Sequence, residues 1–270
     1  MAERVFYQAI YLSGRPREIV PAALASLARA LQLDPEAADA HLVRGIFSAF
    51  YEYNWKAADE HFLRALELNP ACPRVRSARS FWLLAPTGRL DEALVEITGA
   101  VNLDPLSSVA RNRQCWVLHN MVKAEAVDRA RALLQLFPSH PVSTFCASST
   151  LLRQGWYEEA ATALERGLDA VPGSAYLLGV LALARAQQGR AADAKRIRAE
   201  LEELSARQYV PFLPRAHASE ACGDMERAYE LLDRAVEERE PLAVPILTDR
   251  RADQLLDPRF QGLLRKMNLA

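Results

Sequence analysis

The stretch that decides the fold reads AADEHFLRALELNP and covers residues 57–70. Its apolar residues recur at spacings of four, three and one, which places them on one face of an α-helix. These residues are Ala58, Phe62, Ala65 and Leu66. Pro70 ends the helix, because proline has no amide proton and disfavours helical geometry in the residue before it. The alanines let a neighbouring helix approach closely and cost nothing in helix propensity.

The same pattern recurs along the chain at a nearly constant spacing. Successive copies end at Pro35, Pro70, Pro105, Pro138 and Pro172, which are 35, 35, 33 and 34 residues apart. The other copies place these residues at the matching positions: Ala23, Leu27 and Ala30; Ala93, Ile97 and Ala100; Ala126, Ala130 and Leu133; Ala160, Leu164 and Gly167. A further helical segment precedes each copy, often ended by a glycine turn, at Gly14, Gly88, Gly155, Gly189 or Gly223. Each unit is therefore predicted to be a helix, a short turn and a second helix.

This unit resembles the tetratricopeptide repeat, a pair of antiparallel helices about 34 residues long. The resemblance rests on the second-helix residues above and on a glycine five residues before the first alanine, as in Gly88 and Ala93. It implies an all-α, right-handed superhelical solenoid of about seven helix pairs, formed by residues 1–270 as a single array. The units run at about 4–37, 38–72, 73–106, 107–140, 141–174, 175–208 and 209–241. The resemblance also implies a concave face, lined by first helices, that binds a protein or peptide.

Composition and charge agree with a well-packed helical protein. The chain is 50% hydrophobic and 8% aromatic, with a formal net charge of −1. These values exclude a disordered chain and give no reason for general attraction to nucleic acid or membranes. Residues 1–10 lack the apolar core of a signal peptide, and no apolar run approaches a membrane span. The cysteines form no Cys-x-x-Cys pair, so a reduced, cytoplasmic setting is expected.

Aromatic residues gather at two places in the first two units. The first helix is expected to bury Tyr7, Ile10 and Tyr11, and its uncapped start at residues 5–7 would be partly bare. Either another segment precedes it, which is favoured, or a partner covers it. In the second unit the turn at residues 50–55 reads FYEYNW. Packing against the adjacent turn is the favoured interpretation of these rings, and a binding surface is the alternative.

The candidate site lies on the first helices of units three to five, where arginines stand beside tryptophans. Alignment from the second-helix alanines places these side chains near positions that the family exposes on its concave face. The predicted partner-binding residues are Arg79, Trp82, Asn112, Arg113, Trp116, His119, Asn120 and Arg153. A planar guanidinium beside a flat ring suits an acidic or phosphorylated group next to an apolar side chain. The competing interpretation makes the arginines a solvated face and the tryptophans core between repeats.

No pattern predicts catalysis, a cofactor or a metal. No histidine has a second ligand at metal-binding spacing, and the chain has no phosphate loop or nucleophile motif. The adjacent pairs Glu158–Glu159 and Glu202–Glu203 point apart on their helices and cannot face one substrate together. A non-catalytic protein is therefore expected, with an unrecognised catalytic site as the least favoured alternative.

The tail, residues 242–270, breaks the repeat. Asp257-Pro258 is typical of a capped helix start, and Phe260, Leu263, Leu264 and Met267 then form one apolar face, predicted to cover the last repeat. Together with the unit beginning Gly223-Asp224, this tail resembles the end of repeat arrays in bacterial regulators. The resemblance implies an interaction module or scaffold in bacterial signalling or transcriptional regulation that does not itself bind nucleic acid. Self-association of a larger regulator through the array is the alternative.

Overall fold

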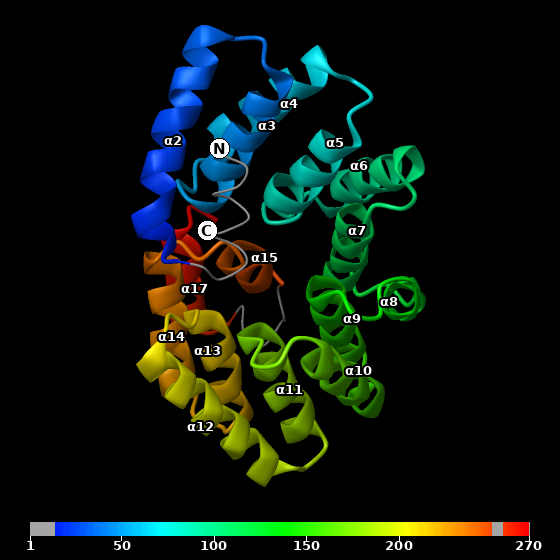
Figure 1. Ribbon diagram of the computed structural model, residues 1–270, viewed down its shortest axis with the longest axis vertical. Helices are drawn as coiled ribbons and strands as arrows, with labels where there is room; N and C mark the ends of the chain where they lie inside the picture. Colours follow the sequence, from blue (N-terminus) through cyan, green and yellow to red (C-terminus); the bar gives the residue numbers. More distant parts are fainter. Residues whose placement is uncertain (1–13, 250–255, 270) are drawn as a thin grey trace. The chain divides into compact units, whose positions relative to one another are not determined.

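The computed structural model describes residues 14–249 and 256–269, and every regular element in these ranges is a helix (Figure 1). In chain order they are α2 (Pro16–Leu33), α3 (Ala38–Phe50), α4 (Trp55–Leu68), α5 (Pro73–Arg79), η1 (Ser80–Leu84), α6 (Leu90–Leu103), α7 (Ser108–Asn120), α8 (Glu125–Leu136), α9 (Pro141–Arg153), α10 (Tyr157–Ala170), α11 (Ala175–Gln187), α12 (Ala191–Arg207), α13 (Phe212–Ala221), α14 (Met225–Glu237), α15 (Ala243–Leu247) and α17 (Pro258–Lys266). Their contacts form two compact units, residues 1–117 with 236–270 and residues 118–235. Each unit contains several of the predicted helix pairs, which are called repeats, and each unit is described by itself.

The helices pair as the repeat pattern predicts. In the first unit α3 packs on α4, while α5 and η1 pack on α6. In the second unit α9 packs on α10 and α11 on α12. The all-α prediction is confirmed. The predicted first helix, with Tyr7, Ile10 and Tyr11, lies outside the described residues.

The register of the second helices follows the small and apolar residues. Ala58, Phe62 and Ala65 are fully buried in α4, and their counterparts Ala93, Ile97 and Ala100 are fully buried in α6. The same holds for α8 and α10 in the second unit, where Ala126, Ala130, Ala160 and Leu164 are fully buried. Alanine suits these positions because the facing helix comes close. Burial of each Leu or Phe in such a stripe stabilises the fold by roughly 1.5–3 kcal/mol before entropy is subtracted.

The turns within repeats share one backbone conformation. Gly88, Gly155, Gly189 and Gly223 have φ of 80°, 83°, 73° and 77°, in the left-handed region that glycine enters without strain. Each of these glycines stands five residues before the first buried alanine of the next helix. In the second repeat this position holds Tyr53, whose φ of 54° is also left-handed.

The first helix of the third repeat departs from regular α-helical geometry. After Arg79 the chain continues as the π-helical turn η1, a geometry that the apolar period does not predict. The Ser80 hydroxyl donates to the carbonyl oxygen of Ala93 on α6 over 2.7 Å, which fixes η1 against its partner helix.

The tail forms the predicted capped helix. The Asp257 carboxylate accepts a hydrogen bond of 2.8 Å from the Arg259 amide, and Pro258 is the first residue of α17. The four apolar residues predicted to form one face are buried: Phe260, Leu263 and Leu264 in α17 and Met267 directly after it. Lys266 lies 3.4 Å from Glu237 at the end of α14, and the Trp55 indole donates to the Met267 carbonyl oxygen over 2.9 Å. The tail therefore contacts the second repeat as well as the last one.

Candidate partner-binding site

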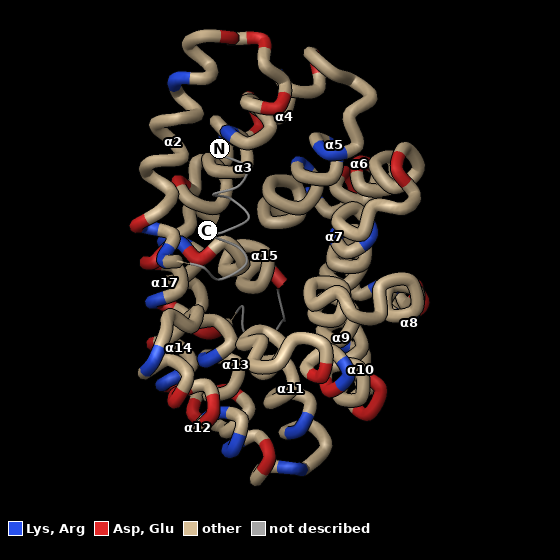
Figure 2. Tube along the Cα trace, in the orientation of Figure 1, with Lys and Arg blue, Asp and Glu red and all other residues tan. Residues whose placement is uncertain are grey.

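The predicted site residues divide between the two units. Arg79, Trp82, Asn112, Arg113 and Trp116 lie in the first unit, and His119, Asn120 and Arg153 lie in the second. Acidic and basic residues are interspersed along the helices of both units (Figure 2).

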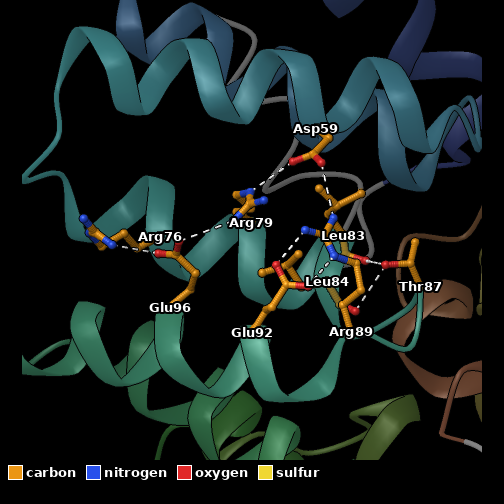
Figure 3. Close-up of polar contacts among 9 residues, drawn as sticks. All are labelled: Asp59, Arg76, Arg79, Leu83, Leu84, Thr87, Arg89, Glu92 and Glu96. Atoms are coloured by element: carbon orange, nitrogen blue, oxygen red, sulfur yellow. Dashed lines mark hydrogen bonds and ion pairs between the residues drawn. The ribbon is translucent and has the colours of Figure 1, made fainter.

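Arg79 lies inside a network of ion pairs between three helices (Figure 3). Its side chain is only 8% exposed. Its Nε is 3.1 Å from Asp59 Oδ1 on α4, and its Nη1 is 3.3 Å from Glu96 Oε1 on α6. Arg76 holds the other oxygen of Glu96 at 2.9 Å. The Arg79 guanidinium is therefore neutralised within the unit and joins one repeat to the next.

Arg89 extends this network at the start of α6. Its guanidinium contacts Asp59 Oδ2 at 3.2 Å and Glu92 at 2.7 Å. The hydrogen bond from Arg89 lowers the pKa of Glu92, and the same bond is the main reason why the pKa of Arg89 is raised. Three arginines thus face three carboxylates. The repeat pattern does not predict these ion pairs, because Asp59 and Glu96 stand 20 and 17 residues from Arg79 and belong to other helices.

The two tryptophans are core residues. Trp82 is 1% exposed and Trp116 is 4% exposed. The Trp82 ring packs edge-on against Phe81, at 4.9 Å between ring centroids, and lies 5.7 Å from Phe50 of the preceding repeat. The structure therefore does not show the indole exposure expected on a concave face, because these first helices are packed between neighbours.

Arg113 and Asn112 are neighbours on α7 that differ in exposure. Arg113 is half-buried, donates to the Ser77 hydroxyl over 3.1 Å, and places its guanidinium carbon 5.3 Å from the centre of the Phe81 ring. Asn112 is 3% exposed, and neither atom of its amide group has a hydrogen-bond partner among the described residues. A buried polar group in this state costs about 1–3 kcal/mol. Asn112 is therefore a buried amide whose polar atoms no described residue satisfies.

In the second unit the three predicted residues differ in exposure. His119 is 2% exposed, whereas Asn120 and Arg153 are half-buried. The amide oxygen of Asn120 is buried and accepts no hydrogen bond from the described part of the chain.

The described residues offer no sign of metal or membrane chemistry. Within residues 14–249 and 256–269, no three His, Cys, Asp or Glu side chains are grouped so that they could hold a metal ion. Among the same residues, no helix has the length and apolar character needed to cross a membrane.

Comparison with known proteins identifies the fold alone. No protein-family model and no curated protein matches the chain. A solved tetratricopeptide repeat protein from Parabacteroides merdae is 14% identical, with 99% of this chain and 98% of that chain covered and a TM-score of 0.59. PilF of Pseudomonas aeruginosa is 21% identical over 76% of this chain and 90% of its own, with a TM-score of 0.55. The hetero-tetramer of Cut9 and Hcn1 from the APC/C contains a chain that is 12% identical over 98% of this chain and 54% of its own, with a TM-score of 0.61.

Proposed function

Because the chain has the tetratricopeptide repeat fold, we propose that it is a non-catalytic scaffold that binds a protein or peptide. Two lines of evidence support the proposal. The chain shares its fold with repeat proteins, one of which was solved as an assembly of Cut9 with Hcn1. A stack of helix pairs also offers an extended surface rather than an enclosed site.

The observation that carries the proposal is the buried amide of Asn112. A side-chain amide offers two donors and one carbonyl acceptor, which matches the polar groups of a peptide backbone. Arg113, the next residue, adds a positive charge that lies over the Phe81 ring. A peptide with an acidic or phosphorylated side chain beside an apolar one fits this pair of groups. Because Asn112 is only 3% exposed, a partner reaches it after neighbouring side chains move.

The proposed biological setting rests on the resemblance of residues 242–270 to the end of repeat arrays in bacterial regulators. We propose that the scaffold acts in the cytoplasm of a bacterium, in signalling or transcriptional regulation, and binds no nucleic acid itself. The net charge of −1 supports the last point, because nonspecific nucleic-acid binding relies on neutralising phosphates with Lys and Arg.

Self-association is the second candidate function, and one surface feature favours it. Leu103, Leu106 and Val109, at the junction of α6 and α7, are 51%, 83% and 37% exposed. Exposed apolar side chains this close together favour contact with another protein surface. If this candidate is right, the mass in solution rises with concentration for the wild type and not for Leu106→Glu.

The test of the first proposal is a quantitative pull-down from lysate of the source cell. Wild type is compared with Asn112→Ala, Arg113→Glu and the control Lys56→Glu, with helicity checked for each. Lys56→Glu makes the same charge change as Arg113→Glu and lies in the same unit, but its side chain is 89% exposed. A partner retained by wild type and the control but lost by both site variants supports the proposal. Equal retention by all four proteins removes the Asn112 site.

A further inference from the structure

The turn of the second repeat has a residue that its backbone disfavours. Tyr53 occupies the position that is glycine in the third, fifth, sixth and seventh repeats, and its φ is 54°. Any residue with a Cβ atom is strained in this left-handed region, and an aromatic residue is a genuine outlier there. Side-chain contacts can offset strain of this kind. The contacts of Tyr53 therefore show what its side chain supplies that glycine cannot.

The contacts of the Tyr53 ring point to the C-terminal part of the chain. Tyr53 is 1% exposed. Its hydroxyl donates to the Val236 carbonyl oxygen over 3.3 Å, across a sequence separation of 183 residues, and the Arg239 guanidinium lies 4.1 Å from its ring centre. Burial is the main cause that raises the pKa of Tyr53 to about 12. The ring thus lies between Trp55, on which it stacks at 6.4 Å between ring centroids, and the residues at and just after the end of α14.

The same turn also holds the end of α17. The Trp55 indole donates to the Met267 carbonyl oxygen, which belongs to the last helical turn, where carbonyl groups lack intrahelical partners. In return, the Asn268 amide donates to the Tyr53 carbonyl oxygen over 3.1 Å. Asn268 has a φ of 56°, the conformation in which asparagine ends a helix. Turn and tail therefore satisfy each other's backbone groups.

We propose that the turn at residues 53–55 is a docking site for the chain's own C-terminal segment, residues 236–247 and 256–269, and that α17 acts as a latch. Opening of the latch releases α17 and frees the Tyr53 carbonyl group and the Trp55 indole while the repeats stay folded. This site is separate from the first-helix residues of the proposed function. The nine-residue α17 is shorter than helices that are stable alone, so its structure depends on this docking.

The turn of the fifth repeat has a more exposed aromatic residue. Trp156, directly before α10, is 48% exposed, and the Arg131 guanidinium of the same unit lies 4.6 Å from its ring centre. The turn of that repeat uses glycine, Gly155, at the left-handed position. The two turns thus differ: the fifth repeat has glycine at the left-handed position and an exposed Trp156, whereas the second repeat has a buried Tyr53 there.

Whether the latch opens on its own is tested by native-state hydrogen exchange of the full chain. In the wild type, the amides of α17 are expected to exchange at least about tenfold faster than those of α4, through an opening that low denaturant does not accelerate. Equal protection of α17 and α4, with the same denaturant dependence, overturns the latch, because α17 then opens only when the unit unfolds.

The role of Tyr53 is tested by Tyr53→Gly, with Val122→Gly as the matched control. Val122 has the same φ of 54° in the turn between α7 and α8, and its side chain is 57% exposed. Both substitutions relieve backbone strain, but only the first removes a ring that contacts Val236 and Arg239 and stacks on Trp55, whose indole bonds the end of α17. Exchange of α17 is expected to rise by about tenfold or more in Tyr53→Gly and to stay unchanged in Val122→Gly. Unchanged exchange of α17 in Tyr53→Gly overturns the proposal.

A second variant keeps the test decisive if Tyr53→Gly folds poorly. Asn268→Gly retains the left-handed backbone and removes only the hydrogen bond to the Tyr53 carbonyl. It is expected to accelerate exchange of α17 several-fold without changing exchange in α10. Acceleration in neither helix argues against docking, and equal acceleration in both shows a global effect and overturns the latch.

Discussion

Arg79 and Arg113 stand 34 residues apart, at equivalent positions in the first helices of consecutive repeats, yet they have different surroundings. Arg79 is held by two carboxylates, whereas Arg113 contacts the Ser77 hydroxyl and the Phe81 ring. The second helices explain the difference. One repeat further along, the positions of Asp59 and Glu96 are taken by Leu94 and Arg129. An arginine at one repeat position can therefore be held by carboxylates in one repeat and lie against a hydroxyl group and an aromatic ring in the next.

The largest expected effect comes from Arg79→Ala. Removing the guanidinium leaves the Asp59 and Glu96 carboxylates, whose side chains are 28% and 16% exposed, without this partner. The free energy of unfolding is expected to fall by about 3 kcal/mol, the lower end for breaking a buried pair. Urea unfolding followed by tryptophan fluorescence measures it. A loss below about 1 kcal/mol, the value typical of a surface pair, would contradict the structural role.

Arg79→Lys is expected to have an intermediate effect. Lysine keeps the charge but has no planar fork with which to reach both carboxylates at once. The expected loss is about 1–2 kcal/mol, that of one charge-assisted hydrogen bond. The same urea experiment measures it, and a loss equal to that of Arg79→Ala would show that geometry matters more than charge.

Arg113→Ala is expected to cost less, about 0.5–1.5 kcal/mol, since the guanidinium donates to a neutral hydroxyl rather than to a carboxylate and lies over an aromatic ring. Partner retention, in contrast, is expected to fall. If the stability of Arg113→Ala falls as far as that of Arg79→Ala, the two positions are equivalent and the comparison fails.

The smallest effect concerns the titration of Glu92 at the edge of the network. Its pKa in the folded protein lies below the ordinary value of 4.5, chiefly because Arg89 donates a hydrogen bond to it. The folded form therefore binds this proton less readily than the unfolded chain. The resulting stability is present above pH 4.5 and is lost as the pH falls through the lower, folded value. In NMR titrations Arg89→Ala is expected to return the Glu92 pKa toward 4.5, and no movement would remove Arg89 as the cause.

The repeat architecture followed from local features of the sequence. Alanine at a helix crossing, as in Ala58 and Ala93, and a proline after each second helix act within a few residues of where they stand. The cap of α17 at Asp257 is local in the same sense. For this reason the helices, their register and the tail helix could be predicted before any distant contact was known.

The surroundings of the candidate site were decided by the tertiary structure alone. The sequence placed Arg79 and Trp82 near an exposed face, but a carboxylate 20 residues away and an aromatic ring from the preceding repeat bury them. The role of Tyr53 depends on a carbonyl group 183 residues further along the chain. Ion pairs and hydrogen bonds form only within about 3–4 Å, and repeat periodicity does not specify which distant groups come that close. The sequence determined which helices form, and the tertiary structure determined which of their side chains are buried or paired.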